Sequence, residues 1–349
     1  MRVLIIKTSP LGELAIALSV LDYLKQASPG IEVDWVVEES LRQVLEGHPE
    51  LSLLHTVRPD AWRRQPFAAS TRNEVTALRG ALDERAYDIV FDLQGDLKSG
   101  LICKLTGCPN RIGFEKEDLK EGVNAFFTTR RIPMRRQDQH LADKYLRLVS
   151  IPFGKDFRQM PLCVTIGVSA EDDADAEALY ATLSDGLVFL FQCGSSLPTK
   201  LWSEAGWIAL GAALLERFPD ATMLLPWGNA GEKGAVTRIA AGIGRGARVL
   251  EAYHLKGLAA VLKKADLVVG VDSGPLQLAA ALGTPTVSLY RSGDARSVGP
   301  RGEQHAVLQS PMHCARCLRK QCDKDLACRD TIKVEAVLAC VEKLLTDHS

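Results

Sequence analysis

Three observations in the sequence predict an α/β protein made of two doubly wound halves. Short runs rich in Val, Ile and Leu recur along the chain and have the length and composition of buried parallel strands. Stretches with an apolar helical face lie between most of these runs. The alternation stops once, in the middle of the chain, and then resumes. We therefore expect two consecutive Rossmann-like domains facing a central cleft, lined by the loops at the carboxyl ends of the strands.

The first half shows this alternation from the amino terminus onward. Its predicted strands are Val3–Ile6, Ile31–Val37, Leu51–Val57, Tyr87–Leu93 and Arg111–Phe114. Its predicted helices are Leu14–Lys25, Leu97–Leu105 and Gln139–Val149. The segment Gly113–Asp138 breaks the pattern and carries two pairs of arginines, and Pro152–Pro161 has the composition of a linker. The first domain is therefore expected at residues 1–152.

The second half repeats the pattern. Its predicted strands are Leu187–Gln192, Ala221–Leu225, Ala247–Leu250, Leu267–Val271, Thr286–Tyr290 and His305–Gln309. Its predicted helices are Ser203–Phe218, Glu232–Gly242, Leu255–Lys264, Leu276–Leu282 and Val334–Leu345. The second domain is expected at residues 153–330. The helix within residues 331–349 is expected to pack back on the first domain.

The composition excludes several classes of protein. The chain has 349 residues, enough for about two domains, and 46% of them are hydrophobic. Its 42 basic and 43 acidic residues nearly balance, which argues against a general nucleic-acid-binding protein. No apolar run approaches the ~18–20 residues that span a bilayer, and the N-terminal apolar segment is too short for a signal peptide. A soluble cytoplasmic protein is the simplest interpretation, with peripheral membrane contact as the alternative.

The turn Asp272-Ser273-Gly274 is the first candidate for a ligand site. It joins the predicted strand Leu267–Val271 to the predicted helix Leu276–Leu282. A carboxylate, a hydroxyl and free backbone N–H groups at a helix N-terminus can hold the phosphates and ribose of a nucleotide. Asp and Ser are also preferred N-cap residues, so an ordinary helix cap explains the turn equally well.

The loop Lys7–Glu13 follows the first predicted strand. Glu13 stands beside Gly12 on a strand-to-helix loop, where a carboxylate can act as a general base near a domain interface. An acid in the first turn of a helix also interacts favourably with the helix dipole, and spacing alone favours that interpretation. No G-x-G-x-x-G motif follows the strand, which weakens an assignment as an NAD-dependent enzyme.

A second candidate site follows the predicted strand Leu187–Gln192. There Ser195 and Ser196 precede Lys200. Hydroxyls and an ammonium group close together suit a diphosphate, because they neutralise charge that develops on a leaving group. A capped helix with a solvated lysine is an equal alternative.

Two tryptophans lie in loops that could bind ligands. Trp227 lies in the turn Leu225–Gly228, where it either packs in the core or forms a platform for a base or sugar. Trp62, Arg63 and Arg64 lie in a proline-containing loop after the third predicted strand and form a candidate grip on an anionic acceptor. A solvated basic loop is the alternative for the second group.

Four of the nine cysteines lie close together near the end of the chain. They are Cys314, Cys317, Cys322 and Cys328. Four thiols at this spacing predict a tetrahedral structural site for zinc or iron, although only the first pair has the spacing common in zinc sites. Neighbouring Arg and Lys residues would offset the thiolate charge. Reduced thiols or a disulfide are the alternatives.

Six segments together resemble glycosyltransferase family 9, and within it the ADP-heptose:lipopolysaccharide heptosyltransferases of the heptosyltransferase I type. The segments are Lys7–Glu13, Asp34–Glu39, Tyr87–Gly100, Lys200-Leu201-Trp202, Leu224–Gly228 and Val271–Tyr290. They occur in the family's order over nearly the whole chain. This co-occurrence is specific, whereas no single segment is.

The resemblance implies a GT-B fold with the acceptor on the N-terminal domain and the nucleotide sugar on the C-terminal domain. It implies inverting, metal-independent transfer of heptose from ADP-L-glycero-β-D-manno-heptose to the lipopolysaccharide inner core. The implied acceptor is Kdo–lipid A or heptosyl-Kdo at the inner face of the inner membrane. No cofactor for catalysis is implied, and the composition has already argued against a nucleic-acid partner and a transmembrane segment.

The resemblance also assigns roles to individual residues. Glu13 stands where the family has an aspartate that serves as the base, and Lys200 would stabilise the leaving diphosphate. The other positions implied to bind the donor are Ser195, Ser196, Glu232, Asp272, Ser273, Gly274 and Gln277. The positions implied to bind the acceptor are Lys7, Ser9, Gly12, Trp62, Arg63, Arg64 and Gln94. Many family members carry a similar cysteine cluster.

The sequence departs from the family at three positions. Ser273 stands where Thr is frequent, and Gln277 stands where His is frequent. A His that is usual in the first helix is replaced by Ile16 or Ala17. Two alternatives therefore stay open: a family 9 enzyme with another acceptor, such as the outer core or a protein, and a non-catalytic nucleotide-sugar-binding protein.

Overall fold

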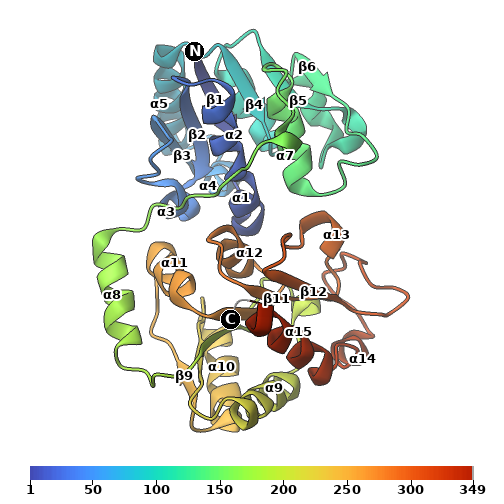
Figure 1. The fold of residues 1–349 in the computed structure, drawn as a ribbon. Coiled ribbons are helices and arrows are strands. Elements are labelled where there is room, and N and C mark those ends of the chain that lie inside the picture. The colour runs from blue at the N-terminus through green and yellow to red at the C-terminus, as the bar shows by residue number, and fades with distance from the viewer. Residues whose placement is uncertain (348–349) are drawn as a thin grey trace. The chain divides into compact units, whose positions relative to one another are not determined.

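The protein divides into two compact units, each built around its own parallel sheet (Figure 1). The computed structural model describes residues 1–347, so the last two residues of the predicted helical segment 331–349 lie outside the described residues. The first unit is Met1–Gly167 and the second is Val168–Ser349.

The boundary between the units lies later in the chain than residue 152, where the sequence analysis placed it. The segment predicted as a linker packs on the first unit instead. Tyr23 donates its hydroxyl to Lys155 O at 2.8 Å, and Nε2 of His48 lies 2.8 Å from Thr165 O. These bonds make the chain up to Gly167 part of the first unit.

The first unit contains a six-stranded parallel sheet. Its strands are β1 (Arg2–Ile6), β2 (Glu32–Glu38), β3 (Leu53–Val57), β4 (Ile89–Asp92), β5 (Arg111–Phe114) and β6 (Arg130–Ile132). Their spatial order is β3-β2-β1-β4-β5-β6, and every pair is parallel. The strand order reverses between β1 and β4. This is the topological switch point, where open α/β sheets bind ligands at the carboxyl ends of their strands.

Strand β6 was not predicted, whereas the other five strands were. It consists of Arg130, Arg131 and Ile132, of which only Ile132 is buried. An edge strand with charged side chains lacks the continuous apolar run that marks a buried parallel strand. The two arginines that interrupt the predicted pattern therefore belong to the edge of the sheet.

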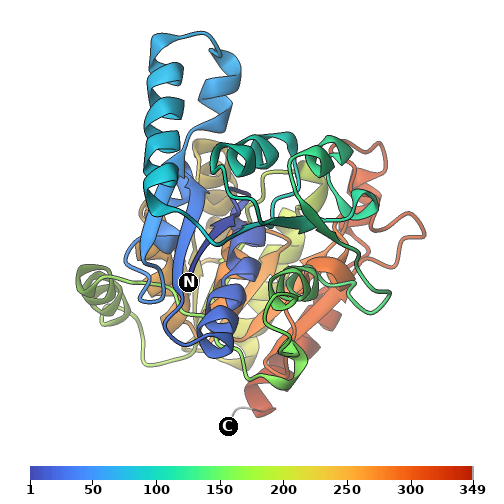
Figure 2. The ribbon, with the colours of Figure 1, turned by 90° about the horizontal axis from the view of Figure 1, so that it is seen from above.

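The helices of the first unit include three, α3, α4 and α5, that the sequence analysis did not anticipate. The helices are α1 (Leu11–Ala17), α2 (Ser19–Ala27), α3 (Arg42–Leu45), α4 (Pro59–Arg64), α5 (Ala69–Arg85), α6 (Leu97–Leu105) and α7 (Leu141–Ser150). The helix predicted at Leu14–Lys25 is divided into α1 and α2. Helices α4 and α5 stand out from the sheet in Figure 2, blue to cyan, where few of their side chains are buried. Their weak apolar pattern explains why they were missed.

The core of the first unit fixes the loop after β1. Residues Val3–Ile6 are fully buried, and so is Trp35 on the neighbouring strand β2. The Trp35 indole N–H donates to Lys7 O at 2.9 Å, and Lys7 N donates to Val36 O. The backbone of Lys7 is therefore attached to β2 just where β1 ends.

The second unit contains another six-stranded parallel sheet. Its strands are β7 (Val188–Gln192), β8 (Thr222–Leu225), β9 (Ala247–Val249), β10 (Leu267–Val271), β11 (Thr286–Tyr290) and β12 (His305–Gln309). Their spatial order is β12-β11-β10-β7-β8-β9, with parallel pairing throughout. All six were predicted. The strand order reverses between β10 and β7, which places the switch point of this sheet there.

The helices of the second unit follow the predicted alternation, with additions. They are α8 (Ala170–Tyr180), α9 (Glu204–Arg217), α10 (Ala230–Ile243), α11 (Leu255–Lys264), α12 (Gly274–Ala281), α13 (Ala295–Val298), α14 (Asp325–Arg329) and α15 (Val334–Asp347). Helix α8 was not predicted because its acidic first turn and scattered alanines give it no apolar face.

Helix α15 packs on the second unit, and its expected contact with the first domain stays a prediction. Its Val337, Val341 and Leu344 are buried in the hydrophobic core that also contains Phe189. The indole of Trp202 donates to Ile332 O at 3.1 Å, just before the helix begins. The apolar face of α15 is therefore covered by α9 and the β11–β12 edge of the second sheet.

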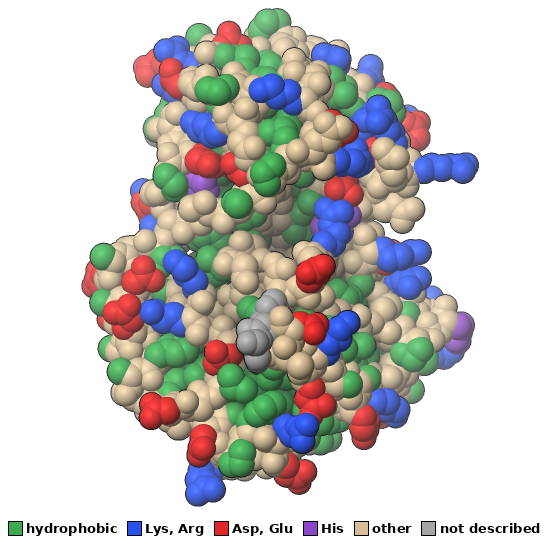
Figure 3. All heavy atoms as spheres, in the orientation of Figure 1, with side chains coloured by type: hydrophobic (Ala, Val, Ile, Leu, Met, Phe, Trp, Pro, Cys, Tyr) green, Lys and Arg blue, Asp and Glu red, His purple; other side chains and the backbone are tan. Residues whose placement is uncertain are grey.

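The surface carries both signs of charge. Basic and acidic side chains are interspersed over the face shown in Figure 3, in keeping with the nearly balanced composition. Among residues 1–347, no helix is long and apolar enough to cross a membrane.

Candidate active site

The loop after β1 brings the predicted base together with predicted acceptor residues. Glu13 lies in the first turn of α1, directly after Gly12, and its side chain is 23% exposed. Its Oε2 lies 2.6 Å from Nζ of Lys7, whose side chain is fully buried. The same Nζ donates to the backbone oxygen of Ser9 at 2.9 Å and to Oε1 of Gln94 at 2.9 Å.

Gln94 spans the switch point of the first sheet. It follows β4, and its Oε1 also accepts from the backbone N–H groups of Thr8 and Ser9, at 3.3 and 3.4 Å. Asp92 stabilises the turn that carries Gln94, because its Oδ1 accepts from Gln94 N and Gly95 N. The side-chain amide of Gln94 thus joins the carboxyl end of β4 to the carboxyl end of β1. These two ends meet at the switch point of the sheet.

Two residues that the sequence analysis did not select also contact Glu13. Lys120, from the segment between β5 and β6, places Nζ 2.9 Å from Oε1 and 2.6 Å from Oε2 of Glu13. Tyr145, a buried residue of α7, donates its hydroxyl to Oε2 at 3.5 Å. Neither lies in the loop Lys7–Glu13, so local spacing gave no signal for them.

The charges around Glu13 keep it ionised. Burial alone would raise the pKa of Glu13, but Lys7 and Lys120 outweigh that effect and hold the pKa below its ordinary value. Burial lowers the pKa of Lys7 to about 8, although Glu13 opposes the shift. The pKa of the Tyr145 hydroxyl is raised by burial and by Glu13, so it stays a proton donor. A carboxylate with a lowered pKa is a weak base. Glu13 would therefore accept a proton more readily if one of the two lysines moved away.

Replacing Lys120 tests this electrostatic arrangement. We expect Lys120→Met to raise the pKa of Glu13, because it removes one of two cations that stabilise the charged form. The acid limb of a pH profile of kcat/KM should then move to higher pH, since the base acts only when deprotonated. Lys120 is 45% exposed, so the variant is expected to fold. Lys116→Met, on the same segment and exposed, is the matched control; an acid limb that stays in place in Lys120→Met would contradict the arrangement.

The group Trp62, Arg63 and Arg64 lies on helix α4 and not in the loop that was expected. The Trp62 indole donates to Glu74 Oε2 at 2.7 Å, and its ring packs on the core of the first unit. Arg63 is 75% exposed and lies 3.7 Å from Asp60. Arg64 donates from Nε to Asp60 O at 3.2 Å. The tryptophan thus has a packing role, and binding of an anionic acceptor by the two arginines stays a prediction.

A lysine–carboxylate pair lies at the predicted donor site in the second unit. Lys200 Nζ lies 2.7 Å from Asp272 Oδ2, and the two side chains are 23% and 8% exposed. Lys200 ends a short 3-10 turn after β7, and Asp272 follows β10. Ser195, also after β7, donates its hydroxyl to Asp272 O at 3.2 Å. These residues occupy the switch point of the second sheet, where a ligand is expected.

Asp272 is also enclosed by the loop after β11. A Cβ atom added to Gly293 would overlap with Asp272 Oδ2, so only glycine leaves room for the carboxylate in this position. We expect Gly293→Ala to displace Asp272 and disturb its pair with Lys200. Misplacing a binding group by about 1 Å can cost up to ~100-fold in rate, so kcat/KM should fall by that order while the melting temperature changes little.

The control for Gly293→Ala is Gly234→Ala. Gly234 lies inside α10, where an added Cβ would meet Arg238 at an ordinary contact distance of 3.6 Å. Activity of the control should equal that of the wild type. Equal activity of Gly293→Ala would show that the position of Asp272 is unimportant.

The remaining predicted residues of this turn have structural partners. Ser273 is the N-cap of α12 and accepts from Leu276 N, and Gly274 is the first residue of the helix. Gln277 is buried and donates from Nε2 to the Tyr290 hydroxyl at 2.9 Å and to Val298 O at 2.7 Å. A contact between Gln277 and the donor would require these two bonds to be given up.

Glu232 joins the carboxyl ends of β7 and β8. Its Oε2 accepts from Gly228 N at 2.8 Å, after β8. A Cβ atom on Gly194, after β7, would lie 2.6 Å from its carboxylate carbon. Trp227 donates its indole N–H to Leu250 O at 2.8 Å and packs on the core, which favours packing over a platform role. Ser196 is exposed on the loop after β7.

The structure does not support the predicted metal site. Among residues 1–347, no group of three or more His, Cys, Asp or Glu side chains is arranged to hold a metal ion. The thiols point to different neighbours: Cys328 Sγ lies 3.6 Å from Ser310 Oγ, and Cys322 Sγ lies 3.9 Å from Asp323 Oδ1. All four cysteines, Cys314, Cys317, Cys322 and Cys328, are free thiols.

Elemental analysis of the purified protein tests this arrangement. We expect no stoichiometric zinc or iron, because a tetrahedral site needs four thiolates about 2.3 Å from one point. One metal per chain, lost together with the melting temperature in Cys314→Ser, would contradict the arrangement of the four thiols.

The segment that carries these cysteines is anchored to the candidate donor site by Arg291. This arginine is 2% exposed and follows β11. Its guanidinium donates to Asp325 Oδ1 at 2.6 Å and to Leu201 O. Arg319 O accepts from the Thr199 hydroxyl at 2.6 Å. The segment thereby supports the loop of Lys200, a role that the sequence analysis did not anticipate.

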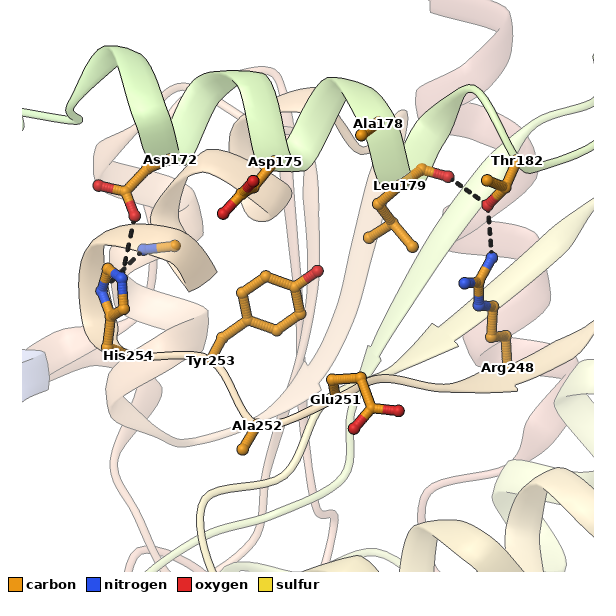
Figure 4. A pocket seen from close by; sticks show the side chains of 11 residues that line it. Asp172, Asp175, Ala178, Leu179, Thr182, Arg248, Glu251, Ala252, Tyr253 and His254 are labelled. Atoms are coloured by element: carbon orange, nitrogen blue, oxygen red, sulfur yellow. Dashed lines mark hydrogen bonds and ion pairs between the residues drawn. The ribbon is translucent and has the colours of Figure 1, made fainter.

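A separate pocket of about 470 Å³ lies in the second unit between α8 and the chain from β9 to α11 (Figure 4). Tyr253 points into it, and Nε2 of His254 lies 3.1 Å from Oδ1 of Asp172 at one end. Arg248 donates to the Thr182 hydroxyl at the other end. None of the residues predicted to bind donor or acceptor lines this pocket.

Two doubly wound sheets, each with polar side chains gathered at its switch point, define a two-domain protein of the Rossmann-like type with a candidate ligand site on each sheet. A family model described as glycosyltransferase family 9 (heptosyltransferase) matches residues 75–327. The chain belongs to this family.

Known relatives support the assignment along the whole chain. Lipopolysaccharide heptosyltransferase 1 of Pseudomonas aeruginosa is 34% identical, over 92% of this chain and 87% of the relative. The enzyme of the same name from Escherichia coli strain K12 is 31% identical, over 89% and 94%. The solved structure of the E. coli heptosyltransferase WaaC with ADP is similar with a TM-score of 0.80 and 28% identity, covering 99% of this chain and all of that one. The expected GT-B fold class is confirmed.

Proposed function

We propose that this chain transfers heptose from ADP-L-glycero-β-D-manno-heptose to the Kdo residue of a lipid A precursor, with inversion at the anomeric carbon. The observation that carries the proposal is the Glu13 carboxylate, held at the switch point of the first sheet by Lys7 and Lys120. Relatives named lipopolysaccharide heptosyltransferase 1 support the choice of heptose and of the lipopolysaccharide acceptor.

The donor is proposed to bind at the switch point of the second sheet. The diphosphate would replace Asp272 as the ion-pair partner of Lys200. It would also accept hydrogen bonds from Ser195 and from the N-terminus of α12 at Gly274. Glu232 would accept from the ribose hydroxyls. The solved structures of the E. coli enzyme with ADP and with ADP-2-deoxy-2-fluoro heptose support a donor of this kind.

The transfer itself is proposed to need one base and one stabilised leaving group. Glu13 takes the proton of the acceptor hydroxyl as the oxygen attacks the anomeric carbon. The bond from that carbon to the diphosphate oxygen breaks, and ADP leaves with the electron pair. Lys200, with its ammonium group, stabilises the charge on the departing diphosphate. The family resemblance implies that these steps need no metal ion.

The acceptor is proposed to adjust the strength of the base. Glu13 is a weak base while both lysines hold it, because they lower its pKa. The carboxylate of Kdo would compete with Glu13 for Lys120, the more exposed of the two lysines. Loss of that contact raises the pKa of Glu13 when the acceptor is in place. Ser9, Gly12 and Gln94 would position the acceptor beside it.

An acceptor panel tests the proposal. Purified protein is incubated with ADP-heptose and one acceptor at a time: Kdo2–lipid A, heptosyl-Kdo2–lipid A or an outer-core glycan. The mass of each product is measured by mass spectrometry. One added heptose on Kdo2–lipid A is expected. Transfer only to another glycan would identify a family 9 enzyme with a different acceptor, and ADP binding without transfer to any acceptor would favour a nucleotide-sugar-binding protein.

A further inference from the structure

The first unit exposes a group of large apolar side chains on two neighbouring elements. They are Leu97 and Leu101 on α6 and Val123 and Phe126 on the 3-10 turn Gly122–Phe126, exposed by 41, 50, 42 and 86%. We call these four residues the apolar patch. Leu97 and Leu101 are one helical turn apart and therefore share a face of α6. Single exposed apolar residues are common, but a group on one surface marks an interaction site.

The two elements that carry the apolar patch are packed against each other. A Cβ atom on Gly100 would lie 2.5 Å from the ring of Phe127 and 3.1 Å from Asn124 Nδ2, so the turn sits directly on α6. Asn124 donates to Asp92 Oδ2 at 2.7 Å and to Asp96 O at 2.8 Å. The apolar patch is thus held in place by buried hydrogen bonds, and its exposure is a feature of the folded unit.

The chain segment that carries the apolar patch is rich in basic residues. Residues 93–136 contain nine Lys and Arg against five Asp and Glu, whereas the whole chain has a net charge of −1. Lys104 is exposed on α6 three residues beyond Leu101, and Arg130 and Arg131 are exposed on the edge strand β6 that follows the turn. In Figure 3, Lys and Arg side chains lie along the edge of the first unit where Figure 1 places β5 and β6, with acidic side chains among them.

The acidic residues of this segment are largely engaged with the protein. Asp96 caps α6, and Glu121 accepts from Leu97 N at 2.9 Å. Asp118 pairs with Lys144 at 3.4 Å. These contacts reduce the negative charge that the surface presents, so its outward character is apolar and basic.

The apolar patch adjoins the proposed acceptor site. Helix α6 begins three positions after Gln94, which contacts Lys7. The segment that precedes the turn is attached to the same loop, because Glu121 N donates to Gly95 O at 3.2 Å. It also carries Lys120, which contacts Glu13. A surface bound by the apolar patch would therefore lie beside the residues that are proposed to receive the acceptor.

We propose that the apolar patch and the basic residues of its segment dock this protein on the surface of an anionic phospholipid bilayer. Apolar side chains flanked by Lys and Arg insert at the boundary between headgroups and acyl chains, while the basic residues attract the anionic headgroups. The proposal goes beyond the proposed sugar transfer, which does not specify how the protein meets its lipid-borne acceptor.

Vesicle co-sedimentation without donor or acceptor tests the proposal. The wild type should bind vesicles that contain phosphatidylglycerol more strongly than vesicles of phosphatidylcholine, and high salt should weaken the binding. The double variant Leu101→Ser/Phe126→Ser should partition at least about tenfold less, because two inserted side chains are lost. Leu326→Ser is the matched control: Leu326 is 75% exposed in the second unit, and its loss should leave binding unchanged.

Folding and self-association are measured on the same samples. The double variant should keep the wild-type melting temperature, since both positions are exposed. If the wild type binds neither kind of vesicle, or the double variant binds as well as the wild type, the proposal is wrong. A wild-type dimer that the double variant dissociates, without vesicle binding, would show that the apolar patch meets a second copy of the chain.

The outcome is independent of the proposed sugar transfer. Binding is measured without substrates, so it can succeed if the donor or acceptor is different. A second arm compares transfer to acceptor embedded in vesicles with transfer to a deacylated, water-soluble acceptor. The double variant should lose activity only with the embedded acceptor, whereas loss with both acceptors would place the apolar patch in the transfer reaction and contradict a docking role.

Discussion

Glu13→Gln should lower kcat by about 10²–10⁴-fold, the range that a positioned general base contributes. The substitution keeps the size of the side chain and removes its ability to take a proton. Lys7 and Lys120 would lose their anionic partner, and the effect on ADP affinity should be small, because all the predicted donor residues belong to the second unit. Initial rates at saturating donor and acceptor, together with ADP affinity measured by calorimetry, check both expectations.

Glu13→Asp is the matched control for that experiment. It keeps the carboxylate but withdraws it by one methylene group, and the family resemblance places an aspartate at this position. We expect activity well above that of Glu13→Gln, with some loss because Lys7 and Lys120 are placed for the longer side chain. Wild-type turnover in Glu13→Gln would show that another group takes the proton.

Lys200→Met should lower kcat by about 10²–10³-fold and weaken the binding of ADP. The expected rate loss is that of removing one group that stabilises developing charge. Methionine keeps much of the length of the side chain and removes the ammonium group, which lies 2.7 Å from Asp272. Steady-state kinetics and calorimetry with ADP measure the two effects.

The control for Lys200→Met must separate charge from folding. Lys200→Arg keeps the positive charge and should retain part of the activity, although its geometry differs. Lys200→Met leaves the Asp272 carboxylate without its ion-pair partner. This can destabilise the protein, because the Asp272 side chain is only 8% exposed, and a melting curve shows whether the fold is affected. Unchanged kcat and ADP affinity in a folded Lys200→Met variant would remove this lysine from the donor site.

The strands of both sheets could be predicted because burial on two faces leaves a local signal. β7 and β10 are buried at every position, and their sequences are apolar except for Gln192 at the end of β7. β6 and α5 escaped prediction because the exposed edge of a sheet and an exposed helix need few apolar residues. Only Thr71, Leu78 and Leu82 are buried in α5.

The candidate site could be predicted only where its residues follow a strand. Glu13 and Asp272 lie in loops next to predicted strands, and the topology explains why Lys7 meets Gln94 across the switch point. Lys120 and Tyr145 are separated from Glu13 by 107 and 132 positions, so their contacts depend on how the sheet and α7 pack.

Two predicted details of the site could not be judged from the sequence alone: the donor contact of Gln277, which stays a prediction, and the metal site, which the structure does not support. Gln277 was assigned to the donor from its place in a motif, but its amide donates to Tyr290 and Val298. The four cysteines are close in sequence, yet the turns between them direct the thiols to different neighbours. Sequence spacing fixes the distance along the chain and not the direction of a side chain.

The most direct test of the proposed mechanism is a crystal structure with a non-transferable donor analogue and a Kdo-containing acceptor bound together. Glu13 is expected about 2.6–3.2 Å from the acceptor hydroxyl that attacks, which is the reach of a general base. Lys200 is expected on the diphosphate of the donor in the same crystal. A complex in which the attacking hydroxyl faces another base, or the diphosphate lies away from Lys200, would contradict the mechanism.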